Sequence, residues 1–222
     1  SDLDVDVNSY YTSYPSSDIA IAAKMADIYY SFAGPLNRRY DEAQSLSSDE
    51  YVGLSFSGNY IDAHTYSNMS LHLFSPDDAS TGYYEELASG ISKANQIIVD
   101  LGGDDAKPNV IAPARAMRAF FHFILMDSYG DIPVLDHLAE DNEVIARQPR
   151  ADVAKFIEKE LLAIIPYLPS DNTQITYGKP TKWMAEALLV KLYINWPVYT
   201  ATSVDKYDAI SYNNEKLSSC VA

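Results

Sequence analysis

Four segments of the chain repeat apolar residues at intervals of three and four, the spacing that places side chains on one face of an α-helix. Helix-ending residues follow the segments: Gly102 and Gly103, Gly130 and Pro133, then Pro166 and Pro169. The segments span residues 82–101, 110–129, 151–168 and 180–196. No strong strand pair is visible, so the pattern predicts an all-α fold.

The order of these helices predicts two antiparallel pairs, 82–101 with 110–129 and 151–168 with 180–196. Stacked helix pairs of this kind resemble tetratricopeptide packing, although the offset of about 70 residues is no strict short repeat. We therefore expect an α-α superhelix of stacked pairs with long irregular loops.

The flanks give further expectations. A helix over 17–33 is capped by Ser16 or Ser17 and ends at Gly34-Pro35. Residues 35–80 are expected to be loops with one or two short helices, and 213–222 to open another helix. Proline is costly inside a helix, so Pro113 is expected in or near the first turn of its helix.

Charge and cysteine content narrow the classes of function. The formal charge is −15, with 31 acidic and 16 basic residues, which disfavours nucleic acid and anionic lipid but suits neutral ligands such as sugars. The single cysteine, Cys220, can form no internal disulfide. There is no run of 18 apolar residues that would predict a membrane span.

Catalytic and cofactor signatures are absent from the sequence. It contains no G-x-S-x-G, no phosphate-binding glycine loop and no His-Glu-x-x-His, and its histidines lack metal-ligand spacing. We expect no catalytic residue, no metal and no cofactor. Polar residues on apolar helix faces, Arg118, Asn95, Asn195 and His122, are expected to be hydrogen-bonded structural residues.

Two pairs of segments carry a family resemblance. The first pair is ISKANQII at 91–98 with ARAMRAFFHFILMDSYGDIPVL at 114–135, and the second is RQPRADVAKFIEKELLAIIPYLP at 147–169 with YGKPTKWMAEALLVKLYINW at 177–196. In their order, spacing and residue patterns, these segments resemble the RagB/SusD family of outer-membrane nutrient-binding lipoproteins. The family commonly has Glu where this chain has Pro113, a departure that concerns the start of that helix.

The resemblance implies a surface-exposed, non-catalytic protein of the outer membrane that binds glycan and passes it to a SusC-like TonB-dependent barrel. It implies an extended tether over 1–16 and the helical N-terminal domain of the family over 17–222, with the family's C-terminal half absent. The only membrane attachment it implies is an N-terminal lipid anchor, which this chain lacks. A helical-repeat scaffold for proteins, without a sugar ligand, is the alternative, and a carbohydrate-active enzyme is the third class.

Residues 58–84 combine aromatic rings with amide, imidazole and carboxylate groups. Sugars need such a mixture, because their C–H faces stack on rings and each buried hydroxyl must be paired. The resemblance adds that an aromatic residue just before the helix at 84 commonly joins the sugar platform, a position nearest to Tyr83. The alternative is that these tyrosines pack loops on helices. The candidate ligand-binding residues are Asn59, Tyr60, His64, Tyr66, Asn68, His72, Asp77 and Tyr83.

Overall fold

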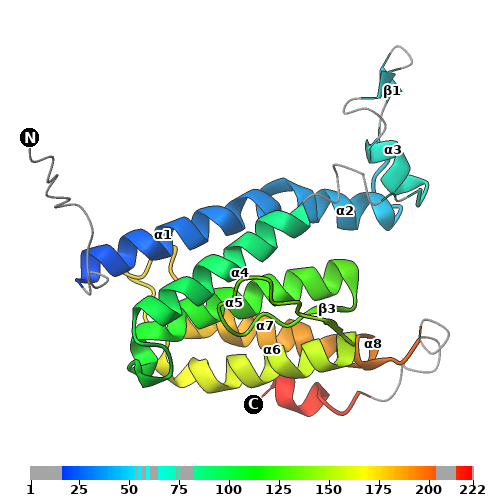
Figure 1. Ribbon diagram of the computed structural model, residues 1–222. Coiled ribbons are helices and arrows are strands. Elements are labelled where there is room, and N and C mark those ends of the chain that lie inside the picture. The colour runs from blue at the N-terminus through cyan, green and yellow to red at the C-terminus, as the bar shows by residue number, and fades with distance from the viewer. Residues whose placement is uncertain are drawn as a thin grey trace, which may run out of the picture.

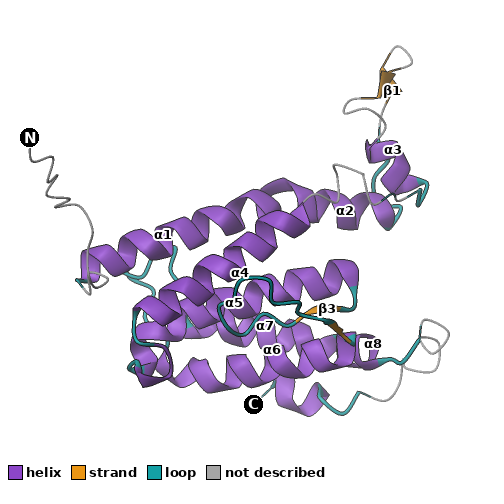
Figure 2. Ribbon diagram, in the orientation of Figure 1, coloured by secondary structure: helices purple, strands orange, loops and turns teal. Residues whose placement is uncertain are grey.

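The computed structural model describes residues 17–53, 55–56, 59–60, 65–73, 75, 83–203 and 214–221, and the predicted all-α fold is confirmed. Its strands, β1 (Ser55–Phe56) with β2 (Asn59–Tyr60) and β3 (Ile132–Pro133) with β4 (Arg147–Gln148), form two short antiparallel pairs (Figure 2). The helical elements are α1 (Asp18–Gly34), η1 (Pro35–Arg39), α2 (Tyr40–Ser47), α3 (Thr65–Ser70), α4 (Tyr83–Asp100), η3 (Gly103–Asp105), α5 (Pro108–Tyr129), α6 (Arg150–Ile164), η4 (Ile165–Tyr167), α7 (Lys182–Ile194), α8 (Trp196–Thr200) and η6 (Leu217–Cys220).

Local sequence explains several helix ends. The Ser17 hydroxyl accepts a hydrogen bond from the backbone N–H of Ala20 at 3.3 Å and so caps α1. The hydroxyl of Thr181 caps α7 in the same way. Helix α5 ends at Gly130, whose φ of 77° lies in the left-handed region that glycine tolerates. The Ser17 cap and the end at Gly130 were expected from the sequence, whereas the helix expected from residue 180 begins at Lys182.

The predicted end of the first helix at Gly34-Pro35 is wrong. The chain continues through a π-helical turn, η1, directly into α2. Proline has no N–H to donate and its ring crowds the preceding turn. The wider π-helical turn accommodates this, and the N–H of Tyr40 donates to the carbonyl of Pro35, five residues earlier. Residues 35–47 are therefore helix, in a stretch where loops with one or two short helices were expected.

Pro113 also lies elsewhere than expected. Helix α5 begins at Pro108, which suits a first position, so Pro113 falls in the second turn, inside the helix. A proline there costs about 3 kcal/mol, and the burial of most of α5 among apolar neighbours offsets it. The segment 213–222, expected to open another helix, contains the short 3-10 helix η6.

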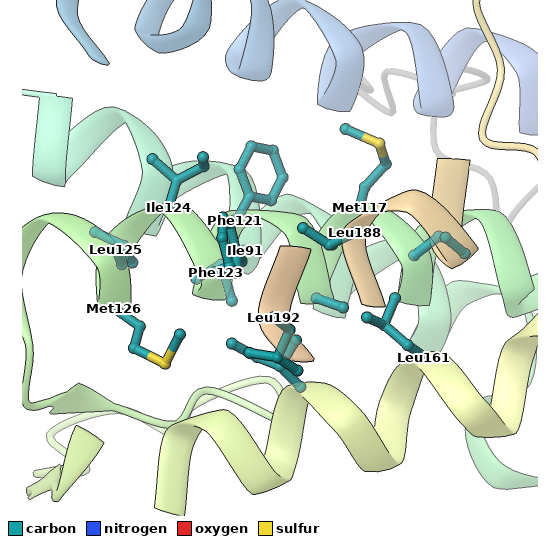
Figure 3. Packing of buried hydrophobic residues seen from close by; sticks show 14 of the residues in the cluster. Ile91, Met117, Phe121, Phe123, Ile124, Leu125, Met126, Leu161, Leu188 and Leu192 are labelled. Carbon is teal, nitrogen blue, oxygen red and sulfur yellow. The ribbon is translucent and has the colours of Figure 1, made fainter. Parts of the chain in front are cut away.

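Helix α5 lies at the centre of the core. It packs against α4 on one side and α6 on the other, while α1 covers α4 and α7 packs against α6 (Figure 1). Figure 3 shows the buried side chains that α4, α5, α6 and α7 bring together, among them Ile91, Phe121, Leu161 and Leu192. The predicted antiparallel neighbours α4–α5 and α6–α7 are thus in contact.

Helices α2 and α3 form an arm that extends beyond the bundle. Helices α1, η1 and α2 follow one another as a long rod along the top of the bundle in Figure 1, and α3 lies at its far end. Helix α3 packs against α2. Consequently, residues of the predicted binding segment lie at the end of this arm, away from α6 and α7.

Candidate functional site

The structure places the predicted site residues in different surroundings. Asn59 and Tyr60 form β2, of which the backbone is described, and His64 and Asp77 lie outside the described residues. Tyr66 and Asn68 belong to α3, and His72 follows it. Tyr83 is the first residue of α4. The arm therefore brings Tyr66, Asn68 and His72 together, whereas Tyr83 belongs to the bundle.

Tyr66 joins an ionic cluster on the arm. Its phenol donates to Glu42 Oε1 at 2.9 Å and accepts a hydrogen bond from the Arg38 guanidinium. Arg38 Nε lies 2.7 Å from the same carboxylate oxygen. Partial burial and the Glu42 carboxylate raise the pKa of Tyr66, while Arg38 lowers it. The net pKa stays above the usual value, so the phenol remains protonated and the cluster presents a cation, a carboxylate and a ring.

Helix α3 is seated closely on the rest of the arm. A Cβ on Gly53 would come within 2.8 Å of the Cβ of Tyr66, so only glycine lets the two segments approach this far. His72 has a left-handed backbone, φ 55°, and its Nε2 lies 2.8 Å from the carbonyl oxygen of Ser47. The Asn68 carbonyl accepts from Leu73 N–H at 2.8 Å. The His72–Ser47 contact joins the end of α3 to the end of α2.

Tyr83 is buried. Its side chain is 3% exposed, and its ring centroid lies 5.7 Å from that of Tyr129. Burial raises the pKa of the Tyr83 phenol. In this structure the ring belongs to the α4–α5 contact, and a ligand at the surface does not reach it.

A groove lies between α1 and the first turns of α4. Its volume is about 570 Å³, and Tyr30 stands beside it with 81% of its surface exposed. Two ion pairs cross from the rod to α4, one between Lys93 Nζ and Asp27 at 3.1 Å and one between Arg39 and Glu86 at 3.1 Å. The groove is lined by Tyr30, Ser31, Ala33, Gly34, Glu85, Glu86, Ser89 and Lys93.

This lining combines an aromatic face with carboxylates and hydroxyls. An exposed tyrosine offers a flat apolar surface for the C–H face of a sugar, and Glu85, Ser89 and Lys93 offer acceptors and donors for hydroxyls. Sequence reasoning missed the groove because Tyr29 and Tyr30 both fit the apolar face of the predicted helix. The structure separates them: Tyr29 packs against the core and Tyr30 faces solvent.

The expected structural residues are indeed bonded. Arg118, 6% exposed, donates to Glu160 at 2.7 Å, to Asn95 Oδ1 at 2.9 Å and to the carbonyl of Asp136 at 2.8 Å. Asn95 donates in turn to the carbonyls of residues 135 and 137. This network holds the loop after α5 against α4, which confirms the prediction for Arg118 and Asn95. Asn195 is half-buried and donates to the carbonyl of Lys191.

His122 is also satisfied inside the core. It is fully buried, with Nδ1 at 2.7 Å from the carbonyl of Arg118 and Nε2 accepting the backbone N–H of Leu135 at 3.0 Å.

Over the described residues there is no cluster of three or more side chains suited to a metal ion. Within that same part of the chain, no helix is both long and apolar enough to cross a membrane.

Fold and site together define a helical-repeat protein with a polar, aromatic groove. Residues 3–194 match the SusD-like family model described as "Starch-binding associating with outer membrane", and the chain belongs to this family. Family members are carbohydrate-binding proteins that do not catalyse reactions. The predicted family is therefore confirmed.

Two curated relatives are similar in sequence. A SusD-like protein of Bacteroides ovatus is 30% identical over 125 residues, which are 52% of this chain and 22% of the relative. SusD-like protein P2 of Formosa agariphila is 30% identical over 121 residues, 51% of this chain and 24% of the relative. The matched part of the chain thus spans about a quarter of the length of these relatives.

Solved structures share the fold. A laminarin-binding SusD-like protein superposes with a TM-score of 0.70 at 19% identity, covering 83% of this chain and 42% of that one. A SusD-like protein of Bacteroides fragilis gives a TM-score of 0.66 at 18% identity, covering 92% and 40% of the two chains.

Proposed function

We propose that this chain is the helical part of a cell-surface protein that binds oligosaccharide and delivers it to a TonB-dependent transporter in the outer membrane. The observation that carries the proposal is the family match over residues 3–194. The laminarin-binding relative supports a glycan ligand, and the acidic surface suits a neutral one. Membrane attachment through a lipid on the complete protein is part of the same proposal.

We propose two surfaces for the glycan. One is the α1–α4 groove with Tyr30, and the other is the arm segment with Tyr66 and its neighbours. Of the residues chosen from the sequence, Asn59, Tyr60, His64 and Asp77 stay within this proposal as part of the same segment. Tyr83 is not proposed as a stacking platform, because it is buried.

Affinity gels with a panel of soluble polysaccharides, run on the full-length protein, test the proposal. We expect one glycan class to retard the protein, and Tyr30→Ala to weaken that retardation at least tenfold in dissociation constant, since stacking on an aromatic ring is lost. Tyr177→Ala is the matched control, because Tyr177 is 83% exposed but lies outside the groove. No retardation by any glycan would remove the glycan-binding proposal.

The arm is tested separately. Tyr66→Phe deletes the hydroxyl that bonds Glu42 and Arg38 but keeps the ring, while Tyr60→Ala deletes a ring. If glycan contacts the arm, Tyr60→Ala weakens binding and Tyr66→Phe changes it through the charged cluster. Equal affinity of both variants and the wild type would confine the site to the groove.

A second candidate, a scaffold for a protein partner, has one observation in its favour. The segment from η4 to the start of α7 leaves large apolar side chains exposed: Tyr167 at 48%, Ile175 at 77%, Tyr177 at 83% and Trp183 at 55%. We propose that these side chains form one surface, because a contiguous exposed apolar patch marks a protein contact. Co-purification of the transporter with wild-type protein, and its loss in Tyr177→Ala with Trp183→Ala, would favour a partner surface here that is separate from the glycan site.

A further inference from the structure

At η1 the rod passes from a part that packs on the bundle to a part that carries α3. Helix α1 packs along α4 as part of the bundle, whereas α2 continues past the π-helical turn and carries α3 (Figure 1). π-Helical turns inside a longer helix often occur at functional positions, and here the turn divides the supported part of the rod from the part that bears α3. The position of α2 therefore depends on contacts made after the turn.

Within the described part of the chain, one carboxylate accepts the side-chain hydrogen bonds that join α2 to the bundle. Asp127, near the end of α5, accepts from the Tyr40 hydroxyl at 2.7 Å and from Gln44 Nε2 at 3.1 Å, both on α2. Its other oxygen accepts from the Tyr199 hydroxyl of α8 at 2.6 Å. In Figure 1 the end of α5 lies between α2 and α8, which agrees with these bonds.

The side of the bundle that anchors Asp127 is itself fixed. Arg150 at the start of α6 donates to the carbonyl of Val198 at 2.6 Å and to that of Tyr199 at 3.3 Å, which ties α8 to α6. Lys191 of α7 adds a cation 5.8 Å from the centre of the Tyr40 ring. Tyr199 is 4% exposed and Asp127 is half-buried, so water reaches their bond only in part.

The protonation of the two phenols fits this arrangement. Burial raises the pKa of Tyr40 and of Tyr199 well above the ordinary value, and the nearby Asp127 charge raises both further. Both phenols therefore stay protonated and donate, and a hydrogen bond to an ionised acceptor is roughly twice as strong as one between neutral groups.

Other links to the bundle are more exposed or less directional. The Arg39–Glu86 pair lies at the turn itself, with side chains 41% and 44% exposed, and exposed ion pairs contribute little. Apolar packing of Tyr40 and Ala43 on the core also holds α2 but fixes its orientation less sharply than directed bonds.

We infer that Asp127 is a positioning residue for the binding surface: it holds α2, and through it α3, in a fixed orientation relative to the α1–α4 groove. Without Asp127, α2 would move about η1, and the Tyr66 cluster would lose its fixed position relative to the groove. The consequence for ligand rests on the proposed glycan-binding function, whereas the effect on the arm does not.

Hydrogen exchange of the full-length protein tests the effect on the arm. Asp127→Ala removes all three acceptor contacts, and we expect amides of α2 and α3 to exchange about tenfold faster or more, while those of α6 keep their rates. Asp127→Asn keeps the shape and one acceptor oxygen, and it should fall between. Asp152→Ala, which removes an exposed Asp paired with Lys155 on α6, is the control and should leave α2 unchanged.

Affinity for the retained glycan tests the positioning role. We expect the dissociation constant to rise at least threefold in Asp127→Ala, with partial recovery in Asp127→Asn. Unchanged exchange in α2 would overturn the inference, and so would faster exchange with unchanged affinity. If Asp127→Ala loosens the whole bundle, Tyr40→Phe, which removes the hydroxyl donor on α2 and keeps the ring, replaces it with the same expectations. If the wild type binds no glycan, the proposed function fails, and the exchange result still decides what Asp127 does to the arm.

Discussion

At the residue scale, the charges inside the bundle are its most sensitive points. Glu160, with a side chain 9% exposed, receives hydrogen bonds from both Arg115 and Arg118. Burial raises the pKa of Glu160, but the bonds and charges of Arg115 and Arg118 outweigh it, so the pKa lies below its ordinary value. The carboxylate is therefore ionised and bonded in the folded protein.

Replacing Glu160 by a neutral residue removes the carboxylate that pairs with Arg115 and Arg118. We expect Glu160→Ala to lower the free energy of unfolding by about 3–5 kcal/mol, because Arg118 becomes an uncompensated buried charge. Urea unfolding measures the loss. Glu186→Ala is the control: its pair with Lys182 is exposed, and we expect a change below about 1 kcal/mol. Equal losses in the two variants would contradict the assigned role of Glu160.

A second residue-scale prediction concerns pH. Burial lowers the pKa of His122 to about 4, so the unfolded chain binds this proton more readily than the folded one. The stability contributed by neutral His122 is complete above about pH 6.5 and is lost as pH falls towards 4, by about 3 kcal/mol at most. The stability that ionised Glu160 contributes is lost only at lower pH, below the ordinary pKa of a glutamate.

Urea unfolding between pH 7 and pH 4, together with an NMR titration of the His122 ring, checks this. A ring that titrates near pH 6.5 in the folded protein would contradict the buried, neutral state.

At the scale of elements, the spacing of α4 and α5 depends on one glycine. A Cβ placed on Gly90 would lie 2.5 Å from Cζ of Phe121, and the Phe121 ring is fully buried. Gly34, by contrast, has an ordinary helical backbone with φ −58°, and a Cβ there would approach only the carboxylate of Glu86, at 3.4 Å. The two helical glycines therefore serve different purposes.

Alanine at these two glycines is expected to change stability in opposite directions. Gly90→Ala should destabilise the protein by about 1–3 kcal/mol, because overpacking at Phe121 exceeds the gain in helix propensity. Gly34→Ala should stabilise it by about 0.5–1 kcal/mol, since alanine favours the helix and only a flexible side chain must adjust. Thermal unfolding of the two variants beside the wild type measures both. Stabilisation by Gly90→Ala would mean that α4 and α5 are further apart than described.

Elements also show where sequence reasoning reached its limit. Apolar periodicity located α4, α5, α6 and α7 because each buries one long face. The Gly34-Pro35 pair misled the prediction, because a proline is normally a stop signal and a π-helical turn leaves no local mark in the sequence. Pro113 misled it in the same way, since the burial that offsets its cost comes from distant residues.

At the scale of the whole molecule, the chain divides into a well-packed bundle and an arm held by fewer contacts. Helix α5 is buried against α4 and α6 along most of its length, while α3 touches the rest of the protein mainly through α2. We predict that native-state hydrogen exchange is slowest in α5 and fastest in α3. Equal protection of the two helices would contradict this division.

The candidate site could be predicted only in part at this scale. Composition indicated that residues 58–84 carry rings and polar groups, and the structure gathers Tyr66, Asn68 and His72 on the arm. The groove depends on α1 crossing the start of α4, and Asp127 depends on α2, α5 and α8 meeting, contacts between residues as far as 87 positions apart. No local pattern encodes such meetings.

The contact between Gly90 and Phe121 also has a historical consequence. A position that admits no side chain and a ring that fills the space above it can change only together. Among homologues that keep this distance between helices, a larger residue at the first position should be accompanied by a smaller one at the second. Paired variation of this kind would let the spacing of the two helices be followed through descent from sequences alone.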